Sequence, residues 1–447
     1  PSNTRNQPLE TGIGVAQAGS LGPAWSFKIG DHGGAGGMTG TPIVADGCVY
    51  VGSGDGSVFA VNADTGELVW RAQAQGAVNA SLAVADGRVF GLVSRSGSPG
   101  AFALNQADGA ALWTAVLDEQ PGSDAYASPV VHDGLVFAGF SGAAAETSVD
   151  EAERLAFQGG YVLLEVATGE VAHKQYTIHP PGQPDDDLAG GAVWSTPAVD
   201  TETGFAYVGT GNPFNPRKQD PRTDAIVKVD LRRGSASFGE IVAHYTGTVD
   251  EYFTELSNSP CVDLPGNPPP WYPQGAGSCF DVDLDFGASP NLFTVDGRKL
   301  VGDGQKSGVY HAADADSMEG VWKALLGPPS LAGGIVGSAA LAGSSIVGPV
   351  TPAGYMWSVG QADGSLGWLA PTADAAHYAH QATVANGVLY TTDTKGFVDA
   401  YDAATGGPLL HLPVDPTAGS LGAGVAVARH TVYAEVGNSL VALRLPA

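Results

Sequence analysis

Three aspartates alternate in one short run of the sequence, Asp281, Asp283 and Asp285. Alternate side chains of an extended strand share one face, so we expect the three carboxylates to converge. Like charges this close are tolerated when a cation binds them or when their pKa values rise. The run resembles the beginning of a calcium loop, but Gly287 is one place late and Leu292 replaces the closing Glu. It therefore predicts a strand facing a metal ion rather than an EF-hand, and an acidic surface strand is the alternative.

Other polar clusters carry weaker signals. The glycine-rich run 52–56 turns between two strand-like runs and opens no helix, so it is not a nucleotide-binding loop. His377 and His380 could share a metal, but histidines in polar loops are commoner. The run 185–187 (D-D-D) is typical of a solvated turn, and no G-x-S-x-G nucleophile sequence is present.

The three cysteines lie in two different settings, Cys48 in one and the other two in a second. Cys48 lies in a strand-like run and is typical of a buried small hydrophobic residue. Cys261 and Cys279 instead bracket a Pro- and Gly-rich segment, 262–278. A disulfide would tether this segment and would imply an oxidising compartment, and two free thiols are the alternative. No C-x-x-C-H sequence is present, so the sequence predicts no attached c-type haem.

The elements that position these residues follow a repeat. Its core reads D-G-x-V-Y-x-G-x-x-x-G-x-V-x-A-x-(D/N)-A-x-T-G-x-x-x-W, and the clearest copy runs from Asp46 to Trp70. The Asp-Gly, Asn-Gly and Thr-Gly pairs supply the positive-φ positions that tight hairpin turns need. The runs between them are rich in β-branched and aromatic residues. Further copies cover 86–113, 133–169, 296–322 and 386–406, with looser ones around 198–234, 339–368 and 425–443.

Strands and glycine turns with a period of roughly 40–50 residues predict an all-β fold, an eight-bladed β-propeller. We expect residues 1–447 to form one domain, with the tryptophan near the end of each unit packed between adjacent blades. The last unit, 425–443, lacks its closing tryptophan strand, and the segment around Trp25 has the sequence of that strand. We therefore expect Trp25 to lie in the last blade, where it closes the ring and leaves no free sheet edge.

Composition excludes several classes of function. The net charge of −26 argues against binding to nucleic acid or to anionic membranes. No apolar run approaches the roughly 18–20 residues of a membrane-spanning helix. The chain opens on Pro1 rather than Met, which fits removal of a signal peptide, so we expect a secreted or periplasmic protein.

Three insertions break the repeat, at 143–159, 213–222 and 250–279, and the face that they crowd should carry the site. The repeat itself resembles the eight-bladed quinoprotein dehydrogenases that carry pyrroloquinoline quinone (PQQ). Three stretches resemble this family specifically, and most closely its polyvinyl alcohol dehydrogenase-like branch. They are 191–213, with G-A-V-W and G-T-G-N-P; 283–292, D-L-D-F-G-A-S-P-N-L; and 297–312, with G-D-G-Q-K-S-G.

The resemblance implies a role for four residues. Trp194 matches the tryptophan on which the flat quinone stacks, and an ordinary inter-blade Trp is the alternative. Asn212 matches a metal ligand and is otherwise a turn residue before Pro213. Asp283 matches the catalytic base, which takes the alcohol proton as hydride passes to the quinone. Lys306 matches the basic residue that hydrogen-bonds the quinone oxygens and is otherwise a solvated hairpin Lys.

The resemblance also implies a metal ion. An acidic residue at the position of Asp285 accompanies lanthanide use in some methanol-oxidising members but occurs in sugar-oxidising members without lanthanides, so we expect calcium, with a lanthanide as the alternative. The glutamate ligand of the family is delayed here to Glu146. Two more positions depart from the family, since the segment 77–81 lacks an Arg and Val336 stands in place of a Trp.

Two classes of function remain open. The first is PQQ-dependent oxidation of a small-molecule or polymeric alcohol, with electrons passed to an external acceptor because no haem domain is present. The second is a binding or scaffold propeller that resembles the outer-membrane assembly lipoproteins, which share the repeat without the cofactor. The matching residues favour the first class, and the departures favour the second.

Overall fold

The computed structural model describes residues 2–146, 148, 150–182, 188–215, 218–247, 284–328, 333–351, 354–372, 380–416 and 422–446. They fall into two compact units. The first comprises Pro1–Asn3, Ser94–Ala101 and Thr114–Val336, and the second comprises Thr4–Val93, Phe102–Trp113 and Gly337–Ala447.

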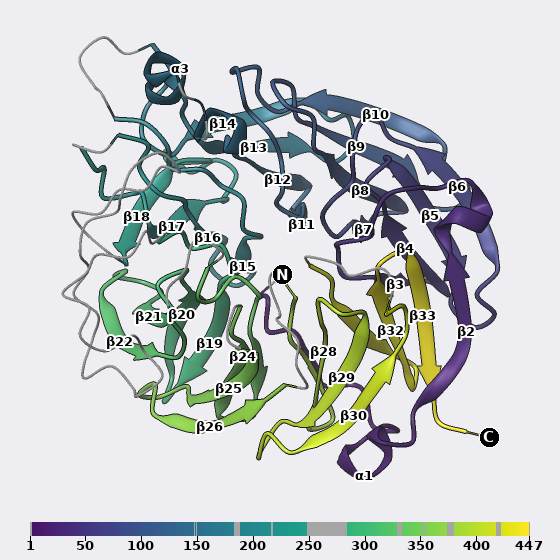
Figure 1. Ribbon diagram of the computed structural model, residues 1–447. Coiled ribbons are helices and arrows are strands. Elements are labelled where there is room, and N and C mark those ends of the chain that lie inside the picture. The colour runs from purple at the N-terminus through teal and green to yellow at the C-terminus, as the bar shows by residue number, and fades with distance from the viewer. Residues whose placement is uncertain are drawn as a thin grey trace. The chain divides into compact units, whose positions relative to one another are not determined.

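Eight antiparallel sheets of mostly four strands form the blades of an eight-bladed β-propeller, as the repeat predicts (Figure 1). In the first unit the sheets are β11 (Val130–His132), β12 (Leu135–Phe140), β13 (Gly160–Glu165) and β14 (Val171–Tyr176); β15 (Ala198–Asp200), β16 (Phe205–Gly209), β17 (Ala225–Asp230) and β18 (Ile241–Thr246); and β19 (Asn291–Val295), β20 (Arg298–Gly304), β21 (Val309–Asp314) and β22 (Gly320–Leu325).

In the second unit the sheets are β3 (Ile43–Ala45), β4 (Cys48–Gly52), β5 (Ser57–Asn62) and β6 (Leu68–Gln73); β23 (Ala340–Ala342), β24 (Ser345–Pro349), β25 (Tyr355–Gly360) and β26 (Leu366–Pro371); β27 (Thr383–Ala385), β28 (Val388–Thr392), β29 (Phe397–Asp402) and β30 (Pro408–Pro413), with β1 (Asn6–Gln7) added in parallel to β27; and β31 (Val425–Ala428), β32 (Thr431–Val436), β33 (Ser439–Arg444) and β2 (Gly22–Lys28). Residues of β7 (Ala83–Ala85), β8 (Arg88–Val93), β9 (Gly100–Asn105) and β10 (Ala111–Val116) are divided between the units.

The helices are short: α1 (Val15–Ala18), the 3₁₀ turn η1 (Ile29–His32), α2 (Ala143–Glu146) and α3 (Glu151–Ala156). The last two lie in the first predicted insertion. In the part of the chain that the structure describes, none of the helices has the length and hydropathy that crossing a membrane requires.

The Asp-Gly and Asn-Gly pairs make the hairpin turns that the sequence predicts. Both residues of the pair have positive φ, as in Asp46 (47°) and Gly47 (82°) between β3 and β4, and in Asn386 (46°) and Gly387 (78°) between β27 and β28. Two successive positive φ values define the type I′ turn, whose twist matches that of the flanking strands.

The N-terminal strand β2 completes the last blade. It pairs antiparallel with β33, with Trp25 opposite Ala442 and Phe27 opposite Leu440. Figure 1 shows the purple β2 beside the yellow β33. Trp25 therefore lies in the last blade, as predicted, and the edge of β33 is covered.

Tryptophans near the blade ends pack between blades, as expected. Trp25 donates its indole N–H to the carbonyl of Ala63, at 3.2 Å, in the next blade. Its ring covers Gly66, where a Cβ atom would lie 2.7 Å from the ring and φ is +77°. The glycine of the Thr-Gly turn is thus required both by its backbone conformation and by the ring above it. The same pair of contacts recurs in Trp70 with Gln106 and Gly109, and in Trp368 with Ala403 and Gly406.

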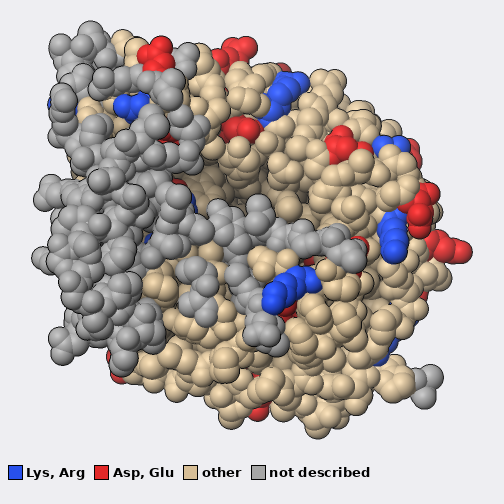
Figure 2. Space-filling view, viewed as in Figure 1, with Lys and Arg blue, Asp and Glu red and all other residues tan. Residues whose placement is uncertain are grey.

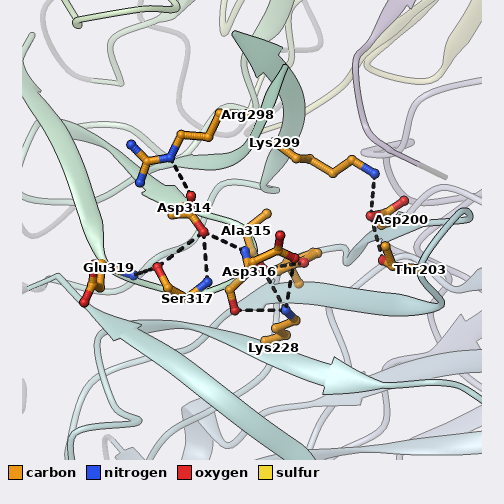
Figure 3. Close-up of polar contacts among 11 residues, drawn as sticks. Asp200, Thr203, Lys228, Arg298, Lys299, Asp314, Ala315, Asp316, Ser317 and Glu319 are labelled. Carbon is orange, nitrogen blue, oxygen red and sulfur yellow. Dashed lines mark hydrogen bonds and ion pairs between the residues drawn. The ribbon is translucent and has the colours of Figure 1, made fainter. Parts of the chain in front are cut away.

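A polar network joins the β15–β18 and β19–β22 blades of the first unit (Figure 3). Lys228 of β17 donates to the carbonyl of Ala315, at 2.8 Å, and Lys299 of β20 donates to the carboxylate of Asp200, at 2.7 Å. An apolar cluster that includes Tyr207 and Val301 packs the same two blades together. This junction fixes the two blades from which the candidate site is built.

Disulfide formation stays a prediction, because Cys261 and Cys279 lie outside the described residues. Cys48 begins β4, is half-buried and is a free thiol. We expect thiol titration of the unfolded, unreduced protein to find one thiol per chain, and three after reduction. Three thiols before reduction would show that the pair is not bonded.

Candidate functional site

The carboxylate of Asp285 brings four of the predicted site residues together in the first unit. Its Oδ1 accepts a hydrogen bond from the backbone N–H of Asn212 at 2.6 Å. Its Oδ2 accepts from the indole N–H of Trp194 at 3.0 Å and from the Lys306 ammonium at 3.3 Å. Asn212, Asp285 and Lys306 are 1%, 5% and 7% exposed, so these contacts are shielded from water.

Backbone hydrogen bonds hold the segments that carry these residues. The N–H of Lys306 donates to the carbonyl of Asp285 at 3.0 Å, and the N–H of Phe286 donates to the carbonyl of Thr210 at 3.2 Å. Asn212 accepts through its carbonyl from Gly191 at 3.0 Å. Loops that connect or precede strands of two adjacent blades are therefore joined main chain to main chain, which makes the site rigid.

Trp194 is the accessible part of the cluster, because it is only half-buried. One edge of its ring lies on the backbone at Gly287, where a Cβ atom would be 2.2 Å from Cη2. Any larger residue at 287 would push the ring away. The Lys306 ammonium lies over the ring, 4.9 Å from its centroid, within cation–π range.

The strand expected at Asp285 is absent, and its role as a metal ligand stays a prediction. Residues 284–290 form no strand, and β19 begins only at Asn291. The segment instead bends so that Asp285 meets three nitrogen donors, one of them the charged Lys306. The Asp285 carboxylate pairs with the Lys306 ammonium. By accepting from both side chains, it positions Lys306 and Trp194. Asp281 and the predicted catalytic base, Asp283, lie outside the described residues.

Glu146, the predicted glutamate ligand, ends helix α2. The preceding residue, Ala145, packs in a small apolar cluster with Phe157 and Phe214. Because Phe214 follows Asn212 by two residues, α2 packs against the segment that carries a second predicted ligand. His380 is buried, and its suggested partner His377 lies outside the described residues.

Sequence reasoning assigned no role to the buried groups beside Lys306. Asp303 of β20 is fully buried, and burial raises its pKa well above the ordinary value. Next to it, His311 forms hydrogen bonds through both ring nitrogens, to Tyr245 Oη (3.1 Å) and to Gln305 Oε1 (3.0 Å). Burial lowers the pKa of His311 well below its ordinary value. The stretch 297–312 contains Asp303 and His311, but only the fold shows that they are buried.

The blade repeat, the inter-blade tryptophans and the cluster around Asp285 define a class, the eight-bladed propellers of the quinoprotein type. The PQQ_2 family model, described as "Outer membrane protein assembly factor BamB", matches residues 15–250, which is more than half of the chain. The chain belongs to this family.

The chain is also similar to individual dehydrogenases. The chain is 29% identical over 353 residues to a polyvinylalcohol dehydrogenase of Pseudomonas sp, covering 75% of this chain and 51% of that protein. It is 27% identical over 434 residues to one of Sphingopyxis sp. (strain 113P3), covering 88% and 63%. The chain thus spans between half and two thirds of the length of these relatives. The crystal structure of quinohemoprotein alcohol dehydrogenase from Comamonas testosteroni shares the fold, with a TM-score of 0.73 at 17% identity over 100% of this chain and 80% of that one.

Proposed function

We propose that this protein oxidises an alcohol with bound PQQ and passes the electrons to an external acceptor. The observation that carries the proposal is the convergence of Trp194, Asn212, Asp285 and Lys306 around one carboxylate. The similarity to two polyvinylalcohol dehydrogenases supports the class of reaction and makes a polymeric alcohol a candidate substrate beside small ones. With the acidic composition, it also supports a secreted or periplasmic location.

The side chains of the cluster suit PQQ. The quinone is flat and anionic, and the half-buried indole of Trp194 offers a ring for stacking beside the cationic Lys306. When bound, PQQ would supply a carbonyl carbon that accepts hydride from the alcohol. Trp194 would hold its plane, and Lys306 would hydrogen-bond its oxygens.

Asp285 acts through the other residues of the cluster. By accepting from Trp194 and Lys306 at once, it fixes the ring plane and the ammonium relative to each other. Asp283, two residues earlier, takes the hydroxyl proton in this proposal. Calcium, or alternatively a lanthanide, would be held by the oxygen donors of Asn212, Asp283 and Glu146, with Asp285 as the additional acidic ligand, and would polarise the quinone carbonyl.

A second function, a binding or assembly scaffold, is supported by one feature of the same cluster. Lys306 already pairs with Asp285 and lies over the ring of Trp194, so the cluster is satisfied by its own side chains. The description of the matched family, an outer-membrane assembly factor, agrees with this alternative. In that case the cluster only joins two blades.

Titration with PQQ distinguishes the two functions. We expect PQQ with calcium or lanthanum to quench tryptophan fluorescence saturably and to support dye reduction by alcohols. Trp194→Ala should abolish both signals, whereas Trp25→Phe, at an inter-blade position, should retain both. If PQQ does not bind saturably with either ion, the proposed enzymatic function is wrong and the scaffold function is favoured.

A further inference from the structure

A second group of potential metal ligands lies in the β27–β30 blade, in the other compact unit. Asp393 follows β28, Asp399 lies in β29, and His411 lies in β30 directly opposite Asp399. One ligand atom of each residue lies within 4.8 Å of the other two. We call these three residues the Asp–Asp–His cluster; Figure 1 shows their strands, β28 to β30, side by side.

Each carboxylate of the cluster has one oxygen that is bonded and one that is not. Oδ1 of Asp393 accepts from the backbone N–H groups of Lys395 (2.8 Å) and Phe397 (3.0 Å), and Oδ1 of Asp399 contacts His411 Nδ1 at 2.6 Å. Both Oδ2 atoms are buried and accept no hydrogen bond from any residue that the structure describes. Both aspartates are 2% exposed. A buried carboxylate oxygen is costly unless a donor or a cation meets it.

The propeller fold does not require these residue types. In the β19–β22 blade the equivalent residues, at the same spacing, are Gln305, His311 and Lys323, and His311 lies opposite Lys323. The backbone N–H of Gln305 donates to the carbonyl of Val309, as that of Asp393 donates to the carbonyl of Phe397. There the two inner side chains satisfy each other, since His311 bonds to the amide of Gln305. In the β3–β6 blade the equivalent residues are Ser53, Phe59 and Arg71. Two carboxylates with an imidazole are therefore particular to the β27–β30 blade among these three.

The surroundings of the cluster suit a bound cation. The imidazole of His411 stacks on Phe397, with ring centroids 4.1 Å apart and an interplanar angle of 3°, so its plane is held. The His411 side chain is 39% exposed, which gives an ion a path from solvent to the buried carboxylates.

We propose that Asp393, Asp399 and His411 bind a divalent first-row transition metal ion, with water completing its coordination. An imidazole beside two carboxylates favours Zn²⁺ or Mn²⁺ over Ca²⁺ and Mg²⁺, which prefer oxygen ligands alone. Metal–ligand distances of about 2.0–2.2 Å place tetrahedral ligand atoms about 3.3–3.6 Å apart. Ligand atoms that lie within 4.8 Å of one another would therefore move closer by at most roughly 1.5 Å when the ion binds. The ion would tie together β28, β29 and β30. This proposal does not depend on the quinone site.

Zinc titration of the chelator-treated full-length protein, without PQQ, tests the proposal. We expect one ion per chain and a melting temperature that rises with the zinc concentration. His411→Gln and Asp393→Asn should each weaken this binding by roughly 100-fold or more, since even the loss of an outer partner costs 10–100-fold. The matched control is His430→Gln, because His430 also pairs with a buried carboxylate, Glu10, at 2.8 Å. It should leave the titration unchanged.

The Asp393→Asn variant separates metal binding from folding. The Asn keeps the Oδ1 acceptor for Lys395 and Phe397 and removes only the second negative charge. We expect the metal-free variant to melt at the same temperature as the wild type or higher, with no stabilisation by zinc. Unchanged zinc binding in both cluster variants would overturn the proposal. So would loss of binding in Asp285→Asn alone, because the ion would then lie at the other cluster.

Discussion

Replacing Asp285 by Ala is expected to lower the free energy of unfolding by about 3–5 kcal/mol and to abolish PQQ binding. The carboxylate is 5% exposed and accepts from Trp194, Asn212 and Lys306. Its removal takes away the carboxylate that lies 3.3 Å from the Lys306 ammonium, which is 7% exposed. Burying that charge is costly, and the indole ring loses the bond that sets its plane. Urea unfolding and PQQ titration measure the two effects.

Two controls make this result specific. Asp285→Asn keeps the shape and one acceptor oxygen, so it should destabilise less than Asp285→Ala while still weakening PQQ binding. Asp64→Ala removes the carboxylate of an exposed pair with Arg444 and should cost at most about 1 kcal/mol. Adding Lys306→Met to Asp285→Ala should recover part of the lost stability. A cost for Asp285→Ala no larger than that for Asp64→Ala would contradict the role of Asp285 as the centre of the cluster.

Deleting residues 1–28 is expected to destabilise the protein by roughly 5 kcal/mol or more. The deletion removes β2, including Phe27, which is 2% exposed and packs against Phe59. Loss of one such aromatic side chain costs about 3–5 kcal/mol, and the deletion also exposes the edge of β33. Thermal unfolding followed by circular dichroism measures the effect.

A rearranged variant isolates the contribution of the closing strand. Gly22 lies opposite Arg444, so residues 22–28 appended after Ala447 through a short turn could form a hairpin with β33. We expect this variant to recover part of the lost stability, because it still lacks Ile13, Ala18 and Leu21, which are buried in the apolar core. If the plain deletion melts at the wild-type temperature, closure by β2 does not stabilise the blade.

Local chemistry in the sequence determined the fold. Positive-φ pairs such as Asp46-Gly47 mark hairpin turns because few residue types tolerate those angles, and they recur in most of the blades. The missing Trp strand of the last unit predicted the position of Trp25, because each repeat states which strand a blade needs. Trp194, Asn212 and Lys306 could be named by resemblance because they lie in short, specific stretches.

Only the tertiary structure decided what those residues touch. Alternation predicted a strand at Asp285, yet residues 284–290 form no strand and the carboxylate meets Asn212, Trp194 and Lys306, because contacts between adjacent blades outweigh local pattern. Glycine is needed at 287 because the ring of Trp194, 93 residues earlier in the sequence, lies against the backbone there. The Asp–Asp–His cluster has no sequence signature, because its meaning depends on two carboxylates being buried side by side. Burial is set by packing of the whole blade, and no local pattern of residues encodes it.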